Sequence, residues 1–149
     1  EALILDADLE AITYFEVSGV RSSRATPSAA PAEEEDIEPS HSLQTAVRDD
    51  DKGFRIRIRT EIDVSIGSII VDVSADYELA TISARSIDQA VLQSFVNGVA
   101  VMALVPYIRQ SVSDITLRVF GSALTMALVR RGEMEFELSP TKMQGETKG

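Results

Sequence analysis

Two long runs of alternating apolar and polar residues meet at Gly67-Ser68, near the middle of the chain. Before this junction the apolar side chains occupy even positions: Phe54, Ile56, Ile58, Ile62, Val64 and Ile66. After it they occupy odd positions: Ile69, Val71, Val73, Ala75, Tyr77 and Leu79. Because successive side chains of a strand point to opposite faces, the pattern predicts a long antiparallel hairpin with one buried face.

The polar positions of this hairpin carry opposite charges on its two strands. The strand before the turn is basic, at Arg55, Arg57 and Arg59. The strand after it is acidic, at Asp72, Asp76 and Glu78. These residues share the outer face, where we expect them to pair across the strands. Exposed ion pairs contribute only about 0–1 kcal/mol each, so they favour the register more than the stability.

Helical periodicity begins at Ser86, which has the spacing of a capping box with Gln89. Apolar residues then recur at helical intervals, at Ile87, Val91, Phe95 and Met102. After Pro106 a second apolar stripe follows, at Ile108, Val112, Ile115 and Val119. The spacing predicts two helices, the second of which ends at a Gly121 cap.

The remaining segments differ in composition. Residues 1–24 combine a short helix, suggested by Leu3, Leu5, Leu9 and Ile12, with a strand over 12–17. Residues 25–53 are rich in proline and acidic residues, which predicts a flexible connector. Residues 122–149 predict an extended segment and a loose tail.

The order of these elements indicates the fold class. Strands that precede helices predict an α+β fold, in which the helices pack on one face of an antiparallel sheet. We expect residues 54–121, with the strand in 12–24, to form a single domain.

Charge and composition narrow the classes of function. The net charge of −10 falls within residues 1–51, since residues 52–149 carry equal numbers of basic and acidic residues. An acidic chain repels phosphate backbones, so we expect no nucleic-acid partner, although acidic residues also serve solubility alone. The absence of cysteine fits a reducing compartment such as the cytoplasm.

The sequence offers no recognisable catalytic or metal-binding motif. It contains one histidine, His41, in the acidic connector, whereas a metal site needs several converging ligands. It has neither a phosphate-binding glycine loop nor a nucleophile elbow. Acidic pairs such as Asp72 and Asp76 are expected to be solvated. We therefore expect no enzymatic activity, metal or cofactor.

Residues 89–108 contain no charged side chain and have the length of a membrane span. Polar residues at Gln93, Ser94 and Asn97 and interruptions at Gly98 and Pro106 argue against insertion in a membrane. In a soluble domain, one hairpin cannot cover a helix that is apolar nearly all round. We therefore expect a homo-oligomer, a bound ligand or both.

Residues 104–118, LVPYIRQSVSDITLR, resemble the long helix of the SecB family of export chaperones. Pro106, Tyr107 and Arg109 match the family pattern, whereas Gln110 replaces its usual glutamate. Val119 stands where a glycine commonly ends the helix, and the proline-rich segment that follows in the family is absent. The chain thus resembles a divergent relative, such as those linked to toxin–antitoxin systems or carried by phages.

The resemblance implies a four-stranded antiparallel sheet followed by two helices, and assembly as a homotetramer. It also implies an ATP-independent chaperone, or holdase, that binds unfolded polypeptides through apolar grooves, for export or for antitoxin protection. The residues expected to contact clients or sister subunits are Phe95, Val99, Met102, Leu104, Pro106, Tyr107, Arg109, Phe120 and Met126. Candidates for binding a secretion motor ATPase or another partner are Asp72, Asp76 and Glu78.

Two alternatives remain open from the sequence. Methionines such as Met102 and Met126 suit an adaptable binding surface, but they also fill cores. The same apolar helix would serve equally in a structural or adaptor subunit, for example of a phage particle, that assembles without binding clients.

Overall fold

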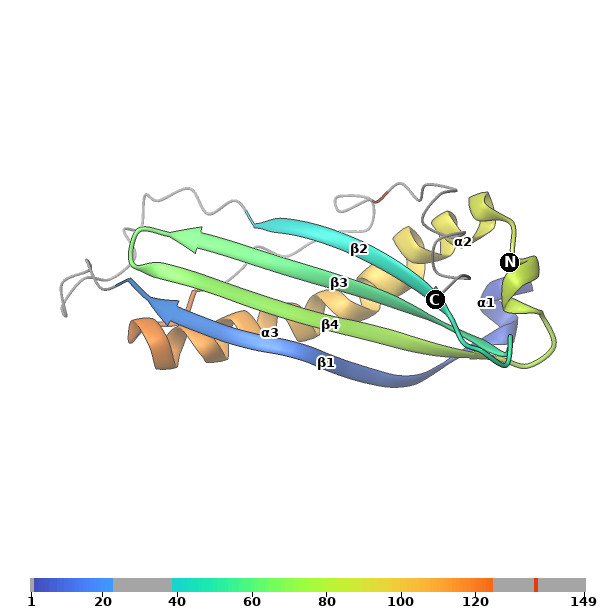
Figure 1. The fold of residues 1–149 in the computed structure, drawn as a ribbon, viewed down its shortest axis with the longest axis horizontal. Coiled ribbons are helices and arrows are strands. Elements are labelled where there is room, and N and C mark those ends of the chain that lie inside the picture. Colours follow the sequence, from blue (N-terminus) through green and yellow to red (C-terminus); the bar gives the residue numbers. More distant parts are fainter. Residues whose placement is uncertain (1, 23–38, 125–135, 137–149) are drawn as a thin grey trace.

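The computed structural model describes residues 2–22, 39–124 and 136 (Figure 1). The strands are β1 (Ala7–Arg21), β2 (Ser40–Val47), β3 (Gly53–Val64) and β4 (Gly67–Leu79). The helical elements are α1 (Ala2–Asp6), the 3-10 turn η1 (Ala84–Ser86), α2 (Gln89–Phe95), the π-helical turn η2 (Val96–Ala100) and α3 (Val101–Phe120).

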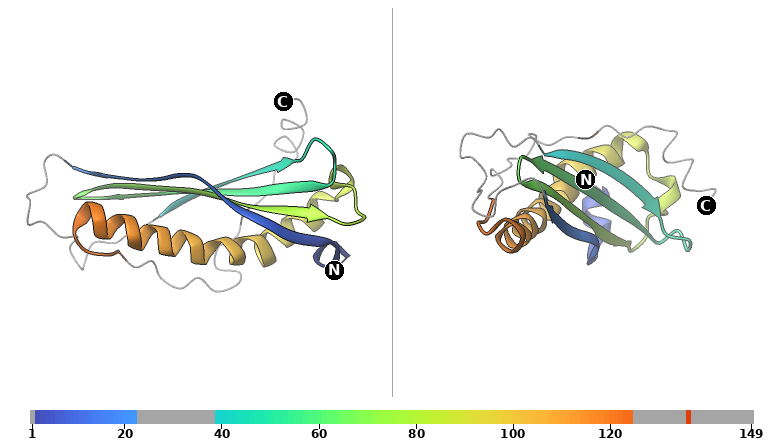
Figure 2. Two further views of the ribbon diagram at one scale, coloured as in Figure 1. Left: turned by 90° about the horizontal axis from the view of Figure 1, so that it is seen from below. Right: turned by 60° about the vertical axis from the view of Figure 1, so that its left-hand side comes forward.

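The described strands form one antiparallel sheet in the order β1-β4-β3-β2. α2, η2 and α3 follow one another directly and cross a single face of this sheet (Figures 1 and 2). Among the described elements, none of the helices lies on the other face (Figure 2). The predicted α+β class with a four-stranded antiparallel sheet is confirmed.

β3 and β4 form the predicted hairpin, in which Ile62 pairs with Ile69 and Ile58 with Val73. Its turn lies at residues 65–66, not at the expected Gly67-Ser68, which begin β4. Its apolar positions face the helix and supply most of the buried residues of the sheet: Phe54, Ile56, Ile58, Ile62, Ile66, Ile69, Val71, Val73, Ala75, Tyr77 and Leu79. A large apolar side chain contributes about 1.5–3 kcal/mol when it is fully buried. At the turn, a Cβ on Gly67 would lie 2.0 Å from the carbonyl oxygen of Val20, so only glycine fits there.

The helix packs over the β4 and β1 side of the sheet. Its buried face includes Leu104, Ile108 and Val112. The closest approach to β1 is at Gly19, where an added Cβ would lie 2.9 Å from Val119 and 3.0 Å from Ile115. The absence of a side chain at this position lets the end of α3 lie directly on the edge strand.

The two predicted helices are present as α2 and α3, but they meet at η2, and α3 passes through Pro106 without a break. Pro106 removes one helical hydrogen-bond donor. Its ring is exposed, whereas Leu104 and Ile108 on either side are buried in the core. Packing on the sheet therefore holds the helix together across the proline.

The predicted cap at the C-terminal end of the helix is present, whereas the one predicted at its N-terminal end is not. Gly121 has a φ of 84°, the left-handed conformation expected of a C-terminal cap. The capping box at Ser86 does not form: Ser86 belongs to η1, and its hydroxyl donates a hydrogen bond to the carbonyl of Ser83. The residue that precedes α2 is Asp88, whose side chain makes no capping hydrogen bond.

Two further strand boundaries differ from the prediction. β1 is longer than 12–17 and begins directly after α1. Within the predicted connector 25–53, the eight residues of β2 form an edge strand with Leu43 and Thr45 buried. His41 belongs to this strand and its side chain is partly buried. Its Nδ1 atom lies 2.8 Å from the hydroxyl oxygen of Thr60. The predicted extended segment and tail over 122–149 lie largely outside the described residues.

The helix Gln89–Phe120 has the length and apolar composition of a membrane span. In this fold, however, one side of it forms the core of the sheet. Packing against the sheet accounts for the apolar run in the sequence.

The close contact at Gly19 predicts that a side chain there displaces the helix. We expect Gly19→Val to lower the free energy of unfolding by about 1–3 kcal/mol, the usual cost of overpacking. The matched control is Gly98→Ala, because a Cβ at Gly98 meets no other atom within 4 Å. Urea unfolding followed by circular dichroism compares the two variants, and equal losses would contradict the packing described here.

Candidate functional site

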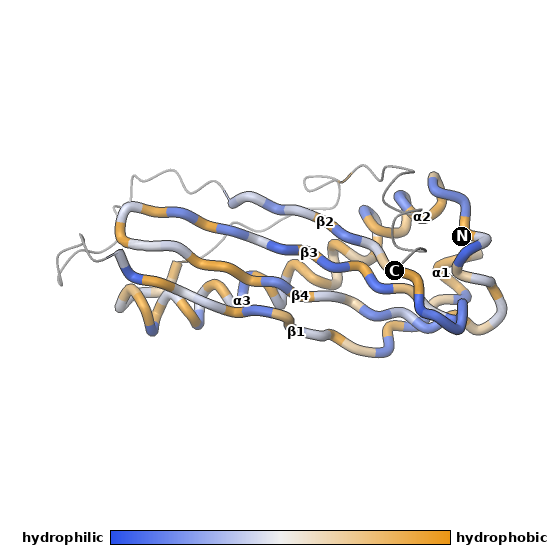
Figure 3. The backbone as a smooth tube through the Cα atoms, viewed as in Figure 1, coloured by the Kyte–Doolittle hydropathy of each residue, from blue (hydrophilic) through white to orange (hydrophobic). Residues whose placement is uncertain are grey.

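The inner face of β1 is apolar but incompletely covered. Leu9, Tyr14 and Val17 are 46%, 46% and 42% exposed. Their partners on β4 are Tyr77, Val73 and Val71, all of which are buried. The apolar face of the sheet therefore continues beyond the area that the chain itself covers. We call Leu9, Tyr14 and Val17 the apolar edge, and Figure 3 shows β1 as the outermost strand on this side.

β1 is also an edge strand whose outer side pairs with no other described strand. It has 15 residues, against eight for β2 at the opposite edge. Its register with β4 shifts between Leu9 and Ala11 and again between Tyr14 and Glu16. A long apolar edge strand is a template for pairing with another extended chain. α1, which leads directly into β1, adds the exposed side chains of Ile4 and Leu5.

Three of the helix residues predicted to contact clients or subunits lie in the core instead. Phe95, Leu104 and Phe120 are at most 4% exposed. Phe95 packs edge-on against Tyr77 and Phe54, with ring centroids 4.9 Å and 5.5 Å apart. The helical spacing of apolar residues in the sequence does not show which of them face the core and which face a partner. Only the position of the sheet decides this.

The other predicted helix residues are more accessible. Pro106 and Tyr107 are exposed, and Val99, Met102 and Arg109 are partly buried. Met126 lies outside the described residues. Met102, Arg109 and Thr116 follow one another at intervals of seven, so they lie along one side of α3.

The π-helical turn η2 brings Asn97 to the same side of the helix. In a regular α-helix each residue turns by about 100°, so Asn97 and Met102 would lie about 140° apart. The extra residue of a π-helical turn reduces this angle to about 40°. We call Asn97, Met102, Arg109 and Thr116 the helix flank.

Two residues of the helix flank bind the main chain of residues that follow the helix. The Asn97 side chain accepts a hydrogen bond from the N–H of Phe136, at 2.8 Å, and donates one to its carbonyl, at 3.0 Å. The Thr116 hydroxyl accepts a hydrogen bond from the N–H of Leu124, at 2.8 Å. The sequence analysis missed both roles. The only signal for Asn97 was a polar side chain within an uncharged helix.

The outer face of the sheet carries the expected ion pairs. Arg55 contacts Asp76 and Arg57 contacts Asp72, each at 2.7 Å. Arg59 adds a contact of 3.4 Å to Asp72. The guanidinium groups of Arg55 and Arg57 also lie 4.9 Å and 3.9 Å from the ring centroid of Phe15 on β1.

The expectation that these carboxylates are solvated is wrong for Asp72, which is 1% exposed. Its hydrogen bonds with Arg57 hold the pKa of its carboxyl below the usual value, against the effect of burial. Burial also acts to raise the pKa of Asp76, but hydrogen bonds from Arg55 and Thr13 outweigh it and the net shift is downward. Glu78 is exposed and lies 3.7 Å from Arg48.

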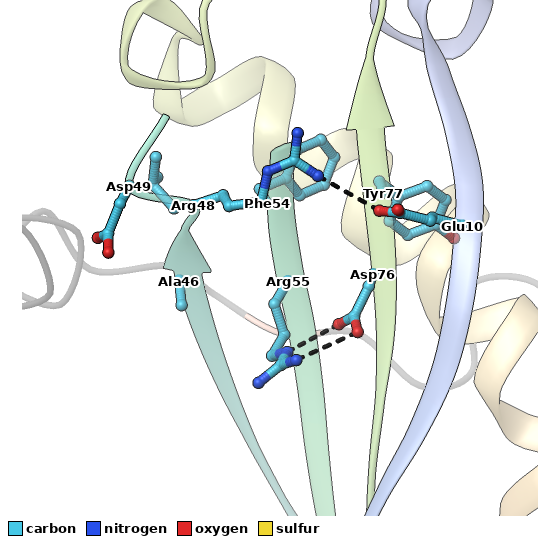
Figure 4. A pocket seen from close by; sticks show the side chains of 9 residues that line it. Glu10, Ala46, Arg48, Asp49, Phe54, Arg55, Asp76 and Tyr77 are labelled. Carbon is cyan, nitrogen blue, oxygen red and sulfur yellow. Dashed lines mark hydrogen bonds and ion pairs between the residues drawn. The ribbon is translucent and has the colours of Figure 1, made fainter. Parts of the chain in front are cut away.

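One hollow on the sheet, of about 350 Å³, lies between the ends of the strands (Figure 4). Four of its five charged side chains are paired, because Arg48 reaches Glu10 at 3.3 Å and Arg55 reaches Asp76. Among the described residues, no group of three or more His, Cys, Asp or Glu side chains could hold a metal ion.

No family model matches the sequence, and no curated protein matches it. Among solved structures, the chain is similar to the Mycobacterium tuberculosis SecB-like chaperone Rv1957 in complex with a ChAD peptide from the Rv1956 HigA1 antitoxin. The TM-score is 0.69 at 17% identity, over 87% of this chain and 91% of that one. The chain has a SecB-like fold.

A second solved structure shows a weaker similarity. It is a protein of unknown function from Streptococcus agalactiae, with a TM-score of 0.44 at 11% identity, over 83% of this chain and 98% of that one. The SecB-like assignment of the fold rests on the first similarity and on the element order described above.

The buried position of Asp72 makes Arg57 its essential partner. We expect Arg57→Ala to cost about 2–3 kcal/mol at neutral pH, somewhat less than for a fully isolated buried charge because Arg59 remains nearby. The pKa of Asp72 is lower in the folded state than its ordinary value of 3.8. The ionised carboxylate therefore stabilises the folded protein at a pH above 3.8, and this contribution is lost as the pH falls through the folded-state pKa. The difference between variant and wild type should therefore shrink at about pH 3.

Urea unfolding at both pH values provides the measurement. Arg48→Ala serves as the control, because Arg48 makes its contacts among exposed carboxylates. We expect a much smaller loss for this variant. An equal loss from both, or a loss for Arg57→Ala that does not change with pH, would contradict the role given to Asp72.

Proposed function

We propose that the protein is an ATP-independent SecB-like chaperone that holds unfolded polypeptides. The observation that carries this proposal is the apolar surface that a SecB-like fold leaves uncovered here. Among the described residues, the large apolar side chains that remain exposed are Ile4, Leu5, Leu9, Tyr14, Phe15, Val17, Val20, Val91, Tyr107 and Leu117. Surfaces of this kind bind other polypeptides, and the role requires neither a catalytic group nor a cofactor.

The apolar edge supports self-association as part of this function. Two copies of β1 can pair antiparallel about a two-fold axis, which would satisfy their outer main-chain groups and cover Tyr14 and Val17 of both copies. The proposed interface thus lies on β1 and not on the helix face inferred from the sequence. A homotetramer, as in the family that the sequence resembles, would arise from two such dimers.

The proposed partner is an unfolded polypeptide, and an antitoxin is one candidate. The similar Mycobacterium tuberculosis chaperone was solved with an antitoxin peptide, which supports this class of client. Docking of a secretion motor ATPase has less support, since Asp72 and Asp76 are already paired with arginines. Glu78 remains an exposed candidate for such a contact. We propose a cytoplasmic location, consistent with the absence of cysteine.

A light-scattering assay tests the holdase function. We expect the purified protein to suppress aggregation of a chemically denatured client at near-stoichiometric ratios, with no change when ATP is added. Binding of many weak apolar segments gives affinity without sequence specificity, so several unrelated clients should be protected. Assembly without any protection would instead favour a structural or adaptor subunit, and a monomer without protection would exclude both roles.

A charged residue on the apolar edge should block assembly. We expect Val17→Lys to convert the oligomer to smaller species, because lysine on an edge strand opposes pairing with a second strand. Leu117→Lys is the control, since Leu117 is 56% exposed on α3 and does not belong to a strand edge. Native mass spectrometry measures the result against the subunit mass of 16.2 kDa. An unchanged oligomer in Val17→Lys would show that β1 is not the interface.

A further inference from the structure

The contact between Asn97 and Phe136 has the form of a peptide-recognition contact. A side-chain amide can donate and accept a hydrogen bond at the same time. Asn97 uses both capacities on the main-chain N–H and C=O of a single residue. On the side of Phe136 only main-chain atoms take part in these bonds. Any extended residue other than proline could therefore bind Asn97 in the same way.

The helix is locally distorted where Asn97 lies. Asn97 belongs to the π-helical turn η2, which interrupts the regular hydrogen bonding between α2 and α3. Such turns occur frequently at functional sites. Here the turn has a direct consequence, because without its extra residue Asn97 would not be in line with Met102 and the rest of the helix flank.

Thr116 provides a second main-chain contact farther along the same flank. Its hydroxyl is fully buried and donates a hydrogen bond of 2.7 Å to the carbonyl of Val112, which leaves its oxygen to accept the N–H of Leu124. The side chains of Leu124 and Phe136 are partly buried and pack against the core. The flank therefore combines main-chain hydrogen bonds with room for large apolar side chains.

We propose that the helix flank is a main-chain-reading site for extended polypeptide, centred on Asn97, and that Phe136 of the same chain occupies it until a client replaces it. This inference rests on the proposed chaperone function and specifies where and how a client binds. The class of ligand is an unfolded segment with a large apolar side chain at the residue held by Asn97. Phe136 then acts as an intramolecular competitor, which lowers the apparent affinity for clients.

The first test measures binding of a permanently unfolded polypeptide, fluorescein-labelled reduced and carboxymethylated α-lactalbumin, by fluorescence anisotropy. We expect Phe136→Ala to bind it about tenfold more tightly than wild type, because the competitor has lost its partly buried ring. Adding Asn97→Ala to that variant should weaken binding by about tenfold, as expected for the loss of two neutral hydrogen bonds. Asn97→Asp, which keeps the acceptor but loses the donor, should behave in the same way.

Gln110→Ala in the Phe136→Ala background is the matched control, since Gln110 is an exposed side-chain amide on the same helix. It should retain the full gain in affinity. Urea unfolding of every variant separates effects on binding from effects on folding. Unchanged or weaker binding by a stably folded Phe136→Ala, or an equal effect of the Asn97 and Gln110 substitutions, would overturn the proposal.

A second test does not depend on any client. A labelled synthetic peptide with the sequence of residues 130–142 should bind Phe136→Ala more tightly than it binds the Asn97→Ala/Phe136→Ala double variant. Equal binding to both would overturn the Asn97 site itself. If the peptide discriminates as expected but α-lactalbumin binds none of the proteins, the main-chain site stands, whereas its use by clients and the proposed chaperone function both fail.

Discussion

Burial of the inner face of the β3–β4 hairpin beneath a single long helix is the interaction on which the rest of the structure depends. The isoleucines and valines of the hairpin are almost fully excluded from solvent, as are Leu104, Ile108 and Val112 of the helix. This contact keeps the helix continuous through Pro106. It also determines which side of the helix can make other contacts, because the face turned to the sheet is buried in the core.

One helix is too narrow to cover four strands. A helix with its side chains is about 10–12 Å across, whereas the outer strands of a four-stranded sheet lie about 14 Å apart before their side chains are counted. α3 contacts β4 and reaches β1 at Gly19, but it does not cover β1 along its whole length, and Tyr14 and Val17 remain half exposed. The proposed self-association would cover this part of β1.

The two faces of the sheet carry different kinds of interaction. On the inner face the strands are held by apolar packing, which has no preferred direction. On the outer face they are held by directional ion pairs between neighbouring strands, such as Arg57 with Asp72. Pairing neutralises most of the charge that the outer face would otherwise present. The proposed binding surfaces instead lie at the edge of β1 and along the helix flank. Asp72 and Asp76, two of the three acidic candidates for partner binding, are engaged in these ion pairs.

The sequence by itself determined the hairpin and the α+β class, because alternation on both sides of the turn gives each strand one apolar face. The register was decided by the tertiary structure, in which the turn lies at residues 65–66 and not at Gly67-Ser68. Local patterns could not reveal β2, whose few buried residues pair with a distant strand, nor the burial of Asp72. Tertiary structure alone decided the candidate sites. Tyr14 is exposed because β1 is outermost, and Asn97 meets Phe136 because a π-helical turn rotates it there, neither of which follows from a residue's nearest neighbours in the chain.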